Sequence, residues 1–160
     1  MSTVVFPGSF DPITLGHVDI AVRARGLFDR VIIAVAHNST KAPLLDVTTR
    51  VKLARSAIAH VDGIEVASTE GLLVDFCEAQ GAVAIVKGLR GGADYDIERP
   101  MALMNRSLTG VETVFITGDS ALAHIASSLV RDVARHGGDV SGYVPPGVET
   151  ALLEALRGDA

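Results

Sequence analysis

The chain has 160 residues, of which 48% are hydrophobic and only 4% aromatic, and tryptophan is absent. Its 14 lysine and arginine residues are outnumbered by 19 aspartate and glutamate residues, which gives a formal charge of −5. Because a protein that coats nucleic acid or a membrane surface needs a basic field, we expect neither partner. The length predicts one domain over residues 1–160, with a core of aliphatic side chains.

Cysteine usage and the lack of a targeting segment predict a cytoplasmic protein. Cys77 is the only cysteine, so no intrachain disulfide can form. It lies in the apolar helical stretch 72–77, where a buried structural thiol is favoured over a reactive one. The N-terminus shows no charged-then-apolar leader, and no apolar run reaches the ~18 residues of a membrane span.

Strand-like and helix-like segments alternate along the chain. The β-branched run 3–6 comes first, and a helical pattern over 15–28 follows it. Further strands are predicted at 31–36, 64–67, 83–87 and 113–117, and further helices at 48–60, 72–80, 94–108, 126–136 and 147–157. The alternation predicts an α/β protein: a single-domain, Rossmann-like, doubly wound parallel sheet of five strands with flanking helices.

The ends of two predicted helices carry local signals. Thr48 or Thr49 is placed to cap the helix over 48–60. Gly137-Gly138 ends the helix over 126–136, and Arg131 and Arg135 near that end suit the negative end of the helix dipole.

Pro100 conflicts with the predicted helix over 94–108. An interior proline lacks an N–H group and clashes with the preceding turn, at a cost of ~3 kcal/mol. The helix is therefore expected either to begin at Arg99-Pro100 or to kink there. Either alternative would displace Glu98, which is a candidate site residue.

The loop after the first strand is the most informative segment, and it reads Phe6-Pro7-Gly8-Ser9-Phe10-Asp11-Pro12-Ile13-Thr14-Leu15-Gly16-His17. A helix begins within it, and a helix N-terminus presents unpaired N–H groups that attract phosphate. His17 stands at this helix start and can add a donor to an oxyanion. No GxxxxGK motif followed by serine or threonine occurs, so the segment predicts nucleotide chemistry without a P-loop.

Glycine-rich and cationic segments follow four of the predicted strands. They are 8–17, His37 to Lys41, Lys87 to Gly92, and 118–120 with the later Ser127-Ser128. Because ligands bind outside the carboxyl ends of strands in open parallel sheets, these segments should meet at one edge. Their convergence predicts a phosphate site there.

Four sets of residues, collinear over essentially the whole chain, resemble a known family. The segment from Gly8 to His17 is similar to the GxFDPxxxGH motif of the nucleotidyltransferase superfamily. The further sets resemble bacterial phosphopantetheine adenylyltransferases specifically: Lys87-Gly88-Leu89-Arg90 with Asp94 and Glu98, Met104-Asn105-Arg106, and 127–134 followed by 137–140. The resemblance implies reversible adenylyl transfer from ATP to 4′-phosphopantetheine, giving dephospho-coenzyme A and pyrophosphate.

The resemblance also implies a role for each matching residue. His17 and Ser9 would act on the α-phosphate, and Lys41 and Lys87 on the acceptor phosphate. Arg90, with Ser127 and Ser128, would act on the β- and γ-phosphates. The implied catalytic residues are His17, Ser9, Lys41 and Arg90. The implied ATP contacts are Ser9, Phe10, His17, Gly88, Leu89, Arg90, Glu98, Leu122, His124, Ser127 and Ser128, and the implied phosphopantetheine contacts are Ser9, Lys41, Leu73 and Lys87.

Cofactor, assembly and regulation are expected from the same resemblance. Mg²⁺ would be bound through the ATP phosphates, the chain would form a homohexamer, and coenzyme A could act as a feedback regulator. No zinc site built by the protein is expected, because His37, His60 and His136 have no partners at ligand spacing.

Several of these residues have structural alternatives. Asp11 fits a turn role at least as well as catalysis or water-mediated magnesium binding. Ser127 and Ser128 could cap a helix, and Leu73 could pack in the core. Leu122 and His124 stand where the family usually has aromatic residues, so Leu122 would give apolar contact to adenine and His124 would stack on it.

Two other functions compete with this hypothesis. The first keeps the fold and changes the acceptor to nicotinamide mononucleotide or another phosphate ester, although the 87–98 segment resembles the phosphopantetheine branch. The second is a nucleotide-binding sensor that has lost turnover, which only the altered 119–126 segment supports. Pyrophosphate release with several acceptors would discriminate between them.

Overall fold

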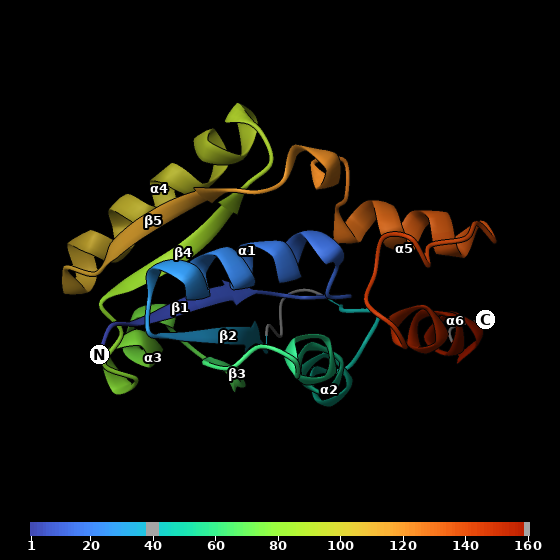
Figure 1. The fold of residues 1–160 in the computed structure, drawn as a ribbon, viewed down its shortest axis with the longest axis horizontal. Coiled ribbons are helices and arrows are strands. Elements are labelled where there is room, and N and C mark those ends of the chain that lie inside the picture. The colour runs from blue at the N-terminus through green and yellow to red at the C-terminus, as the bar shows by residue number, and fades with distance from the viewer. Residues whose placement is uncertain (38–41, 159–160) are drawn as a thin grey trace.

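The computed structural model describes residues 1–37 and 42–158 (Figure 1). Strands and helices alternate over these ranges as predicted. The strands are β1 (Thr3–Gly8), β2 (Arg30–Ala36), β3 (Ile64–Thr69), β4 (Ala84–Leu89) and β5 (Glu112–Thr117). The α-helices are α1 (Leu15–Leu27), α2 (Val47–Ile58), α3 (Leu73–Ala79), α4 (Gly92–Thr109), α5 (Ser127–Arg135) and α6 (Val148–Gly158), and a short 3-10 helix, η1, spans Ser120–Leu122.

The strands form one parallel sheet in the order β3-β2-β1-β4-β5, which confirms the predicted fold class. The chain runs outward from β1 through β2 to β3, then returns to place β4 on the other side of β1. The strand order therefore reverses between β1 and β4. Ligand crevices of doubly wound sheets lie outside the carboxyl ends of the strands at such a point.

Alternate residues of the central strands face opposite sides of the sheet. Val4 and Phe6 join the larger core cluster with side chains of α1 and α2, whereas Val5 packs with Cys77 of α3 on the other side. Cys77 is 1% exposed, and burial raises its thiol pKa to about 11, so the expected buried, unreactive thiol is confirmed. Among the described helices, none is long and apolar enough to cross a bilayer.

Two helix predictions need correction. Asp46 caps α2, because its side chain accepts a hydrogen bond from the Thr49 N–H at 2.7 Å, so the prediction of a threonine cap is wrong. The helix α4 does not begin at Arg99-Pro100 but runs from Gly92 through Pro100 to Thr109. Proline removes only one intrahelical N–H, and the rest of the helix keeps its own bonds.

Close packing fixes α1 against the sheet. The Ile20 side chain lies over Gly88 of β4, where an added Cβ would come within 2.7 Å of Ile20 Cγ1. Gly118, just after β5, also lacks the Cβ that would come within 3.4 Å of Ile20 Cδ1. These two glycines let α1, and the histidine at its start, lie close to the ends of β4 and β5.

Candidate active site

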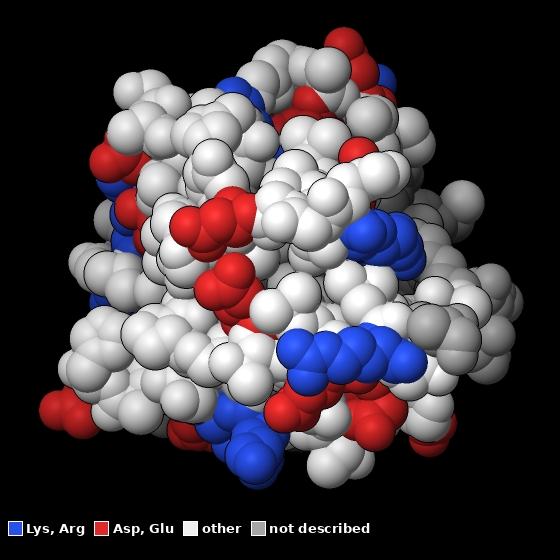
Figure 2. Space-filling view, turned by 90° about the vertical axis from the view of Figure 1, so that its right-hand side faces the viewer, with Lys and Arg blue, Asp and Glu red and all other residues white. Residues whose placement is uncertain are grey.

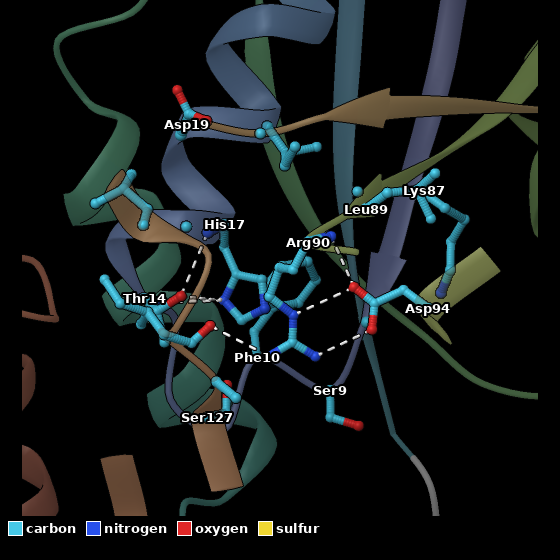
Figure 3. A pocket seen from close by; sticks show the side chains of 18 of the residues that line it. Ser9, Phe10, Thr14, His17, Asp19, Lys87, Leu89, Arg90, Asp94 and Ser127 are labelled. Atoms are coloured by element: carbon cyan, nitrogen blue, oxygen red, sulfur yellow. Dashed lines mark hydrogen bonds and ion pairs between the residues drawn. The ribbon is translucent and has the colours of Figure 1, made fainter. Parts of the chain in front are cut away.

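A cleft of about 850 Å³ lies at the carboxyl ends of the strands, within the size range of ligand sites. Segments that follow β1, β4 and β5 line it, as does the start of α5, which confirms the predicted convergence for these segments (Figure 3). Ala42 and Pro43, which precede α2, line it as well. The candidate residues that line the cleft are Ser9, Phe10, His17, Lys87, Gly88, Leu89, Arg90, Glu98, Leu122, Ser127 and Ser128. The molecular face at this side carries separate basic and acidic groups rather than one basic surface (Figure 2).

Asp11 holds the β1–α1 loop to the segment before α2. Its two carboxylate oxygens accept hydrogen bonds from the Leu44 and Leu45 N–H groups, each at 2.9 Å. The Arg131 guanidinium donates to the Asp11 carbonyl at 2.6 Å. With Asp11 only 5% exposed, the geometry favours the structural alternative for this residue over magnesium binding.

The Phe10 ring packs against the ring of His17. The backbone φ of Phe10, 48°, lies in the left-handed region, which is uncommon for a residue other than glycine. The ring packs edge-on against Phe6 and His17, with centroids 5.4 and 4.8 Å apart. Gly8 makes room for this, since a Cβ there would come within 3.1 Å of the Phe10 ring.

A capping box orients His17 at the start of α1. The Thr14 N–H donates to His17 Nδ1 at 3.0 Å, while the Thr14 hydroxyl accepts from the His17 N–H at 3.3 Å. Because Nδ1 of the neutral ring is an acceptor, the proton must sit on Nε2. His17 therefore offers a neutral N–H donor to the cleft at the site where a helix N-terminus attracts anions.

Burial and two nearby cations keep this imidazole neutral. Desolvation first, then the charges of Arg90 and Lys87, lower the pKa of His17 from 6.5 to about 4. The ring is therefore uncharged at neutral pH. Its Nε2–H group can donate a hydrogen bond to a phosphate oxygen without any change in protonation.

The free energy of unfolding is expected to fall as the pH is lowered from about 6.5 towards 4. In that window the unfolded chain protonates His17, whereas the folded chain resists protonation. A pKa shift of this size corresponds to about 3 kcal/mol, and since the ring borders an open cleft we expect roughly 1–3 kcal/mol. Urea unfolding of the wild type and of His17→Gln at several pH values measures the effect, and parallel pH curves would contradict it.

The two cations at the end of β4 are already oriented by carboxylates of α4. Lys87 Nζ lies 3.2 Å from Glu98 Oε2, and Arg90 Nε lies 3.4 Å from Asp94 Oδ2. Asp94 also accepts the Arg90 backbone N–H at 2.7 Å. Despite Pro100, α4 thus turns Glu98 into the cleft. A bound phosphate would replace these carboxylates as the partner of Lys87 and Arg90, whose side chains already point into the cleft.

The segment around η1 differs in part from expectation. Leu122 lines the cleft, but His124 is exposed, does not line the cleft and packs edge-on against Tyr143 with ring centroids 5.8 Å apart. The expected stacking of His124 on adenine is therefore not supported, because the irregular backbone turns this side chain away. Ser127 begins α5 without capping it: its hydroxyl donates to the Pro12 carbonyl at 2.8 Å, and Ala126 is the N-cap.

One of the expected phosphopantetheine contacts is not found in the cleft. Leu73 does not line it and packs against the core cluster on the α3 side of the sheet, which favours its structural alternative. Lys41 lies outside the described residues.

Three charged cleft residues were not predicted as site residues from the sequence. Arg50, only 2% exposed, donates to the carbonyls of Ser9, Ala36 and Leu45 at 2.7, 2.9 and 2.9 Å. Arg131 lies in the middle of α5 and turns to Asp11 instead of the helix end. Asp19 lines the cleft from α1. In a sequence, each resembles an ordinary charged residue on a helix face.

Comparison with known proteins agrees with this geometry. The family model described as cytidylyltransferase-like matches residues 5–133. A solved structure from Vibrio parahaemolyticus, provisionally named a nicotinate-nucleotide adenylyltransferase, superposes with a TM-score of 0.71 at 21% identity. The match covers 100% of this chain and 98% of that chain, and at this identity it concerns the fold alone. Fold, cleft and family model define a nucleotidyltransferase of the cytidylyltransferase-like class.

Closer relatives share one name. The phosphopantetheine adenylyltransferase of Kocuria rhizophila is 52% identical over 95% of this chain and 98% of its own. Those of Bifidobacterium longum and Heliobacterium modesticaldum are 48% and 49% identical, over 98% and 100% of this chain and 95% and 98% of their own. The chain belongs to the phosphopantetheine adenylyltransferase family.

Proposed function

We propose that the protein transfers the adenylyl group of ATP reversibly to 4′-phosphopantetheine, producing dephospho-coenzyme A and pyrophosphate. The observation that carries the proposal is the meeting of the neutral His17 donor with Lys87 and Arg90 in one cleft. Relatives of 46–52% identity over nearly the full chain are named for this acceptor.

The chemistry needs no activated side chain, because a phosphate oxygen of the acceptor is already an anion. That oxygen forms a new bond to the α-phosphorus of ATP while the bond from this phosphorus to the bridging oxygen breaks and pyrophosphate leaves. The work of the protein is then positioning and charge stabilisation. We assign the α-phosphate to His17 Nε2 and the Ser9 hydroxyl, and the acceptor phosphate to Lys87 and Lys41.

We assign the β- and γ-phosphates to Arg90, with Ser127 and Ser128 at the start of α5. The guanidinium of Arg90 is a planar fork that suits two phosphate oxygens. Its Nη1 also donates to the Ile125 carbonyl at 3.3 Å, which supports a fixed orientation toward α5. Leu122 remains available for apolar contact with adenine from the same side of the cleft.

A magnesium ion is part of the proposal, bound through the phosphates of ATP. The residues described contain no group of three histidine, cysteine, aspartate or glutamate side chains placed to hold a metal. Asp11 is engaged by backbone N–H groups at both oxygens. The donor set therefore suits an ion that arrives with the nucleotide, where it would neutralise phosphate charge.

The two competing functions are not favoured. The structural neighbour named for a nicotinate nucleotide is 21% identical, so its likeness concerns the fold and does not support transfer to nicotinamide mononucleotide. The sensor hypothesis relied on the altered segment before α5, yet Leu122, Ser127 and Ser128 still line the cleft.

Assembly into a homohexamer, feedback by coenzyme A and a cytoplasmic location complete the proposal. The helix α4 supports self-association, because Asn105 is its only buried residue although it carries many large apolar side chains. The exposed ones are Tyr95, Ile97, Met101, Leu103, Met104 and Leu108. An apolar helix face of this extent is typical of an interface. Coenzyme A shares the pantetheine and adenine parts of the substrates and would compete for the same cleft.

The direct test is magnesium-dependent pyrophosphate release from ATP with and without 4′-phosphopantetheine, the product being identified by mass. We expect release only with the acceptor, together with dephospho-coenzyme A. Nicotinamide mononucleotide serves as the control acceptor. Release with that acceptor alone, or ATP binding without any release, would replace the proposal with one of the two alternatives.

A further inference from the structure

Asp19 joins α1, the helix that carries His17, to the segment that follows β5. Its Oδ2 accepts the Asp119 N–H at 2.8 Å, across 100 residues of sequence. Arg23, one turn further along α1, holds both carboxylate oxygens of Asp19 through Nε at 3.0 Å. Figure 3 shows Asp19 on α1 beside His17, at the point where the chain leaves β5.

The partner segment has a hydrogen bond of its own and packs closely against α1. Asp119 caps η1, because its side chain accepts the Ala121 N–H at 2.8 Å. The preceding residue, Gly118, lies so close to α1 that an added Cβ would come within 3.3 Å of Asp19 Oδ2. The carboxylate therefore sets where Gly118, Asp119 and Leu122 stand relative to His17, two residues away on the same helix.

We propose that Asp19 is a positioning residue for the nucleotide, which holds the segment 118–122 at a fixed distance from His17. This inference rests on the proposed function for the identity of the ligand, ATP. The segment lines the cleft and includes Leu122, which is assigned to ATP, whereas the acceptor phosphate is assigned to Lys87 and Lys41. Loss of the Asp19 contact should therefore weaken ATP binding and leave acceptor binding nearly unaffected.

The experiment measures the Kd of ATP by calorimetry without acceptor, and the KM of both substrates, for four variants. We expect Asp19→Ala to raise the Kd and KM of ATP about tenfold or more, the effect of losing a hydrogen bond to a charged group. The KM of the phosphopantetheine acceptor should change less than about twofold. Asp19→Asn keeps an acceptor for the Asp119 N–H and should stay within about threefold of the wild type.

The other two variants separate positioning from folding. Arg23→Ala leaves the cleft lining intact and should raise the KM of ATP about two- to threefold. Asp132→Ala is the matched control, since this carboxylate is exposed on α5 and, among the described residues, pairs only with His136. Amide hydrogen exchange supplies a direct readout: Asp19→Ala should exchange faster over 118–122 and unchanged over 136–142.

Equal weakening of both substrates, or unchanged exchange over 118–122, would overturn the inference. If Asp19→Ala does not fold, the same comparison rests on Arg23→Ala and Asp19→Asn. A wild type that binds ATP but releases no pyrophosphate in the presence of the phosphopantetheine acceptor would instead overturn the proposed function. The ATP Kd values would still decide the role of Asp19 in that case.

Discussion

Replacing His17 with alanine will lower kcat about 10²- to 10³-fold and leave the KM of ATP within about threefold. The reason is the fixed direction of the ring: Thr14 holds Nδ1 as an acceptor, so Nε2–H points its donor at the cleft. Such a donor gains strength as charge builds on the α-phosphate in the transition state. Steady-state kinetics of pyrophosphate release measures both constants.

The control for this variant is His136→Ala, which removes an exposed histidine of the C-terminal end of α5. Within the part of the chain that the structure describes, its ring nitrogens bond only to Asp132, so kcat and KM should stay at the wild-type values. An unchanged kcat in His17→Ala would refute the assignment of His17 to the α-phosphate. A rise in KM alone would instead place its contact in the ground state.

The fold could be predicted because β-branched and helical segments alternate cleanly. Element ends were harder, since neighbours decide them. The first strand was expected to end at residue 6, yet β1 continues through Pro7 and Gly8, which are weak strand formers. These two residues lie opposite Ala34 and Val35 of β2, and the adjacent strand extends the pairing.

The site could be predicted where the chemistry follows a strand end directly, as for Ser9, His17, Lys87 and Arg90. It could not be predicted where a side chain bonds to the backbone of a distant segment. Arg50 reaches the Ser9 carbonyl across 41 residues, and no local pattern marks this contact. The expected stacking of His124 on adenine is not supported for a related reason. The position of a residue in an irregular segment does not fix the direction of its side chain.

The prediction about Pro100 shows that the local cost of a proline does not by itself decide where a helix begins. Proline inside a helix costs ~3 kcal/mol, and this cost predicted that the helix begins or kinks at Arg99-Pro100, just after Glu98. The structure keeps the helix whole, and the Lys87–Glu98 and Arg90–Asp94 pairs anchor its first half to the end of β4. Tertiary contacts to α4 therefore determine where Glu98 lies, and the proline does not displace it from the cleft.

Replacing Arg90 with alanine will lower kcat/KM for ATP about 100-fold. Its guanidinium is the cation assigned to the β- and γ-phosphates, and charge-assisted bidentate contacts of this kind are among the strongest in proteins. Arg90→Lys keeps the charge but loses the planar fork, so it should recover only part of the activity, with a loss of about tenfold. Initial rates at varied ATP concentration give these values.

A second measurement on Arg90→Ala distinguishes loss of the Arg90 charge from a general disruption of the site. The charge of Arg90 contributes to the lowered pKa of His17, so its removal should raise that pKa from about 4. Titration of the His17 ring by NMR detects the change. Arg135→Ala, an exposed arginine on α5, should leave both the kinetics and the titration unchanged. Loss of activity with an unchanged His17 pKa would contradict the assignment of His17 and Arg90 to neighbouring phosphates of the same ATP molecule.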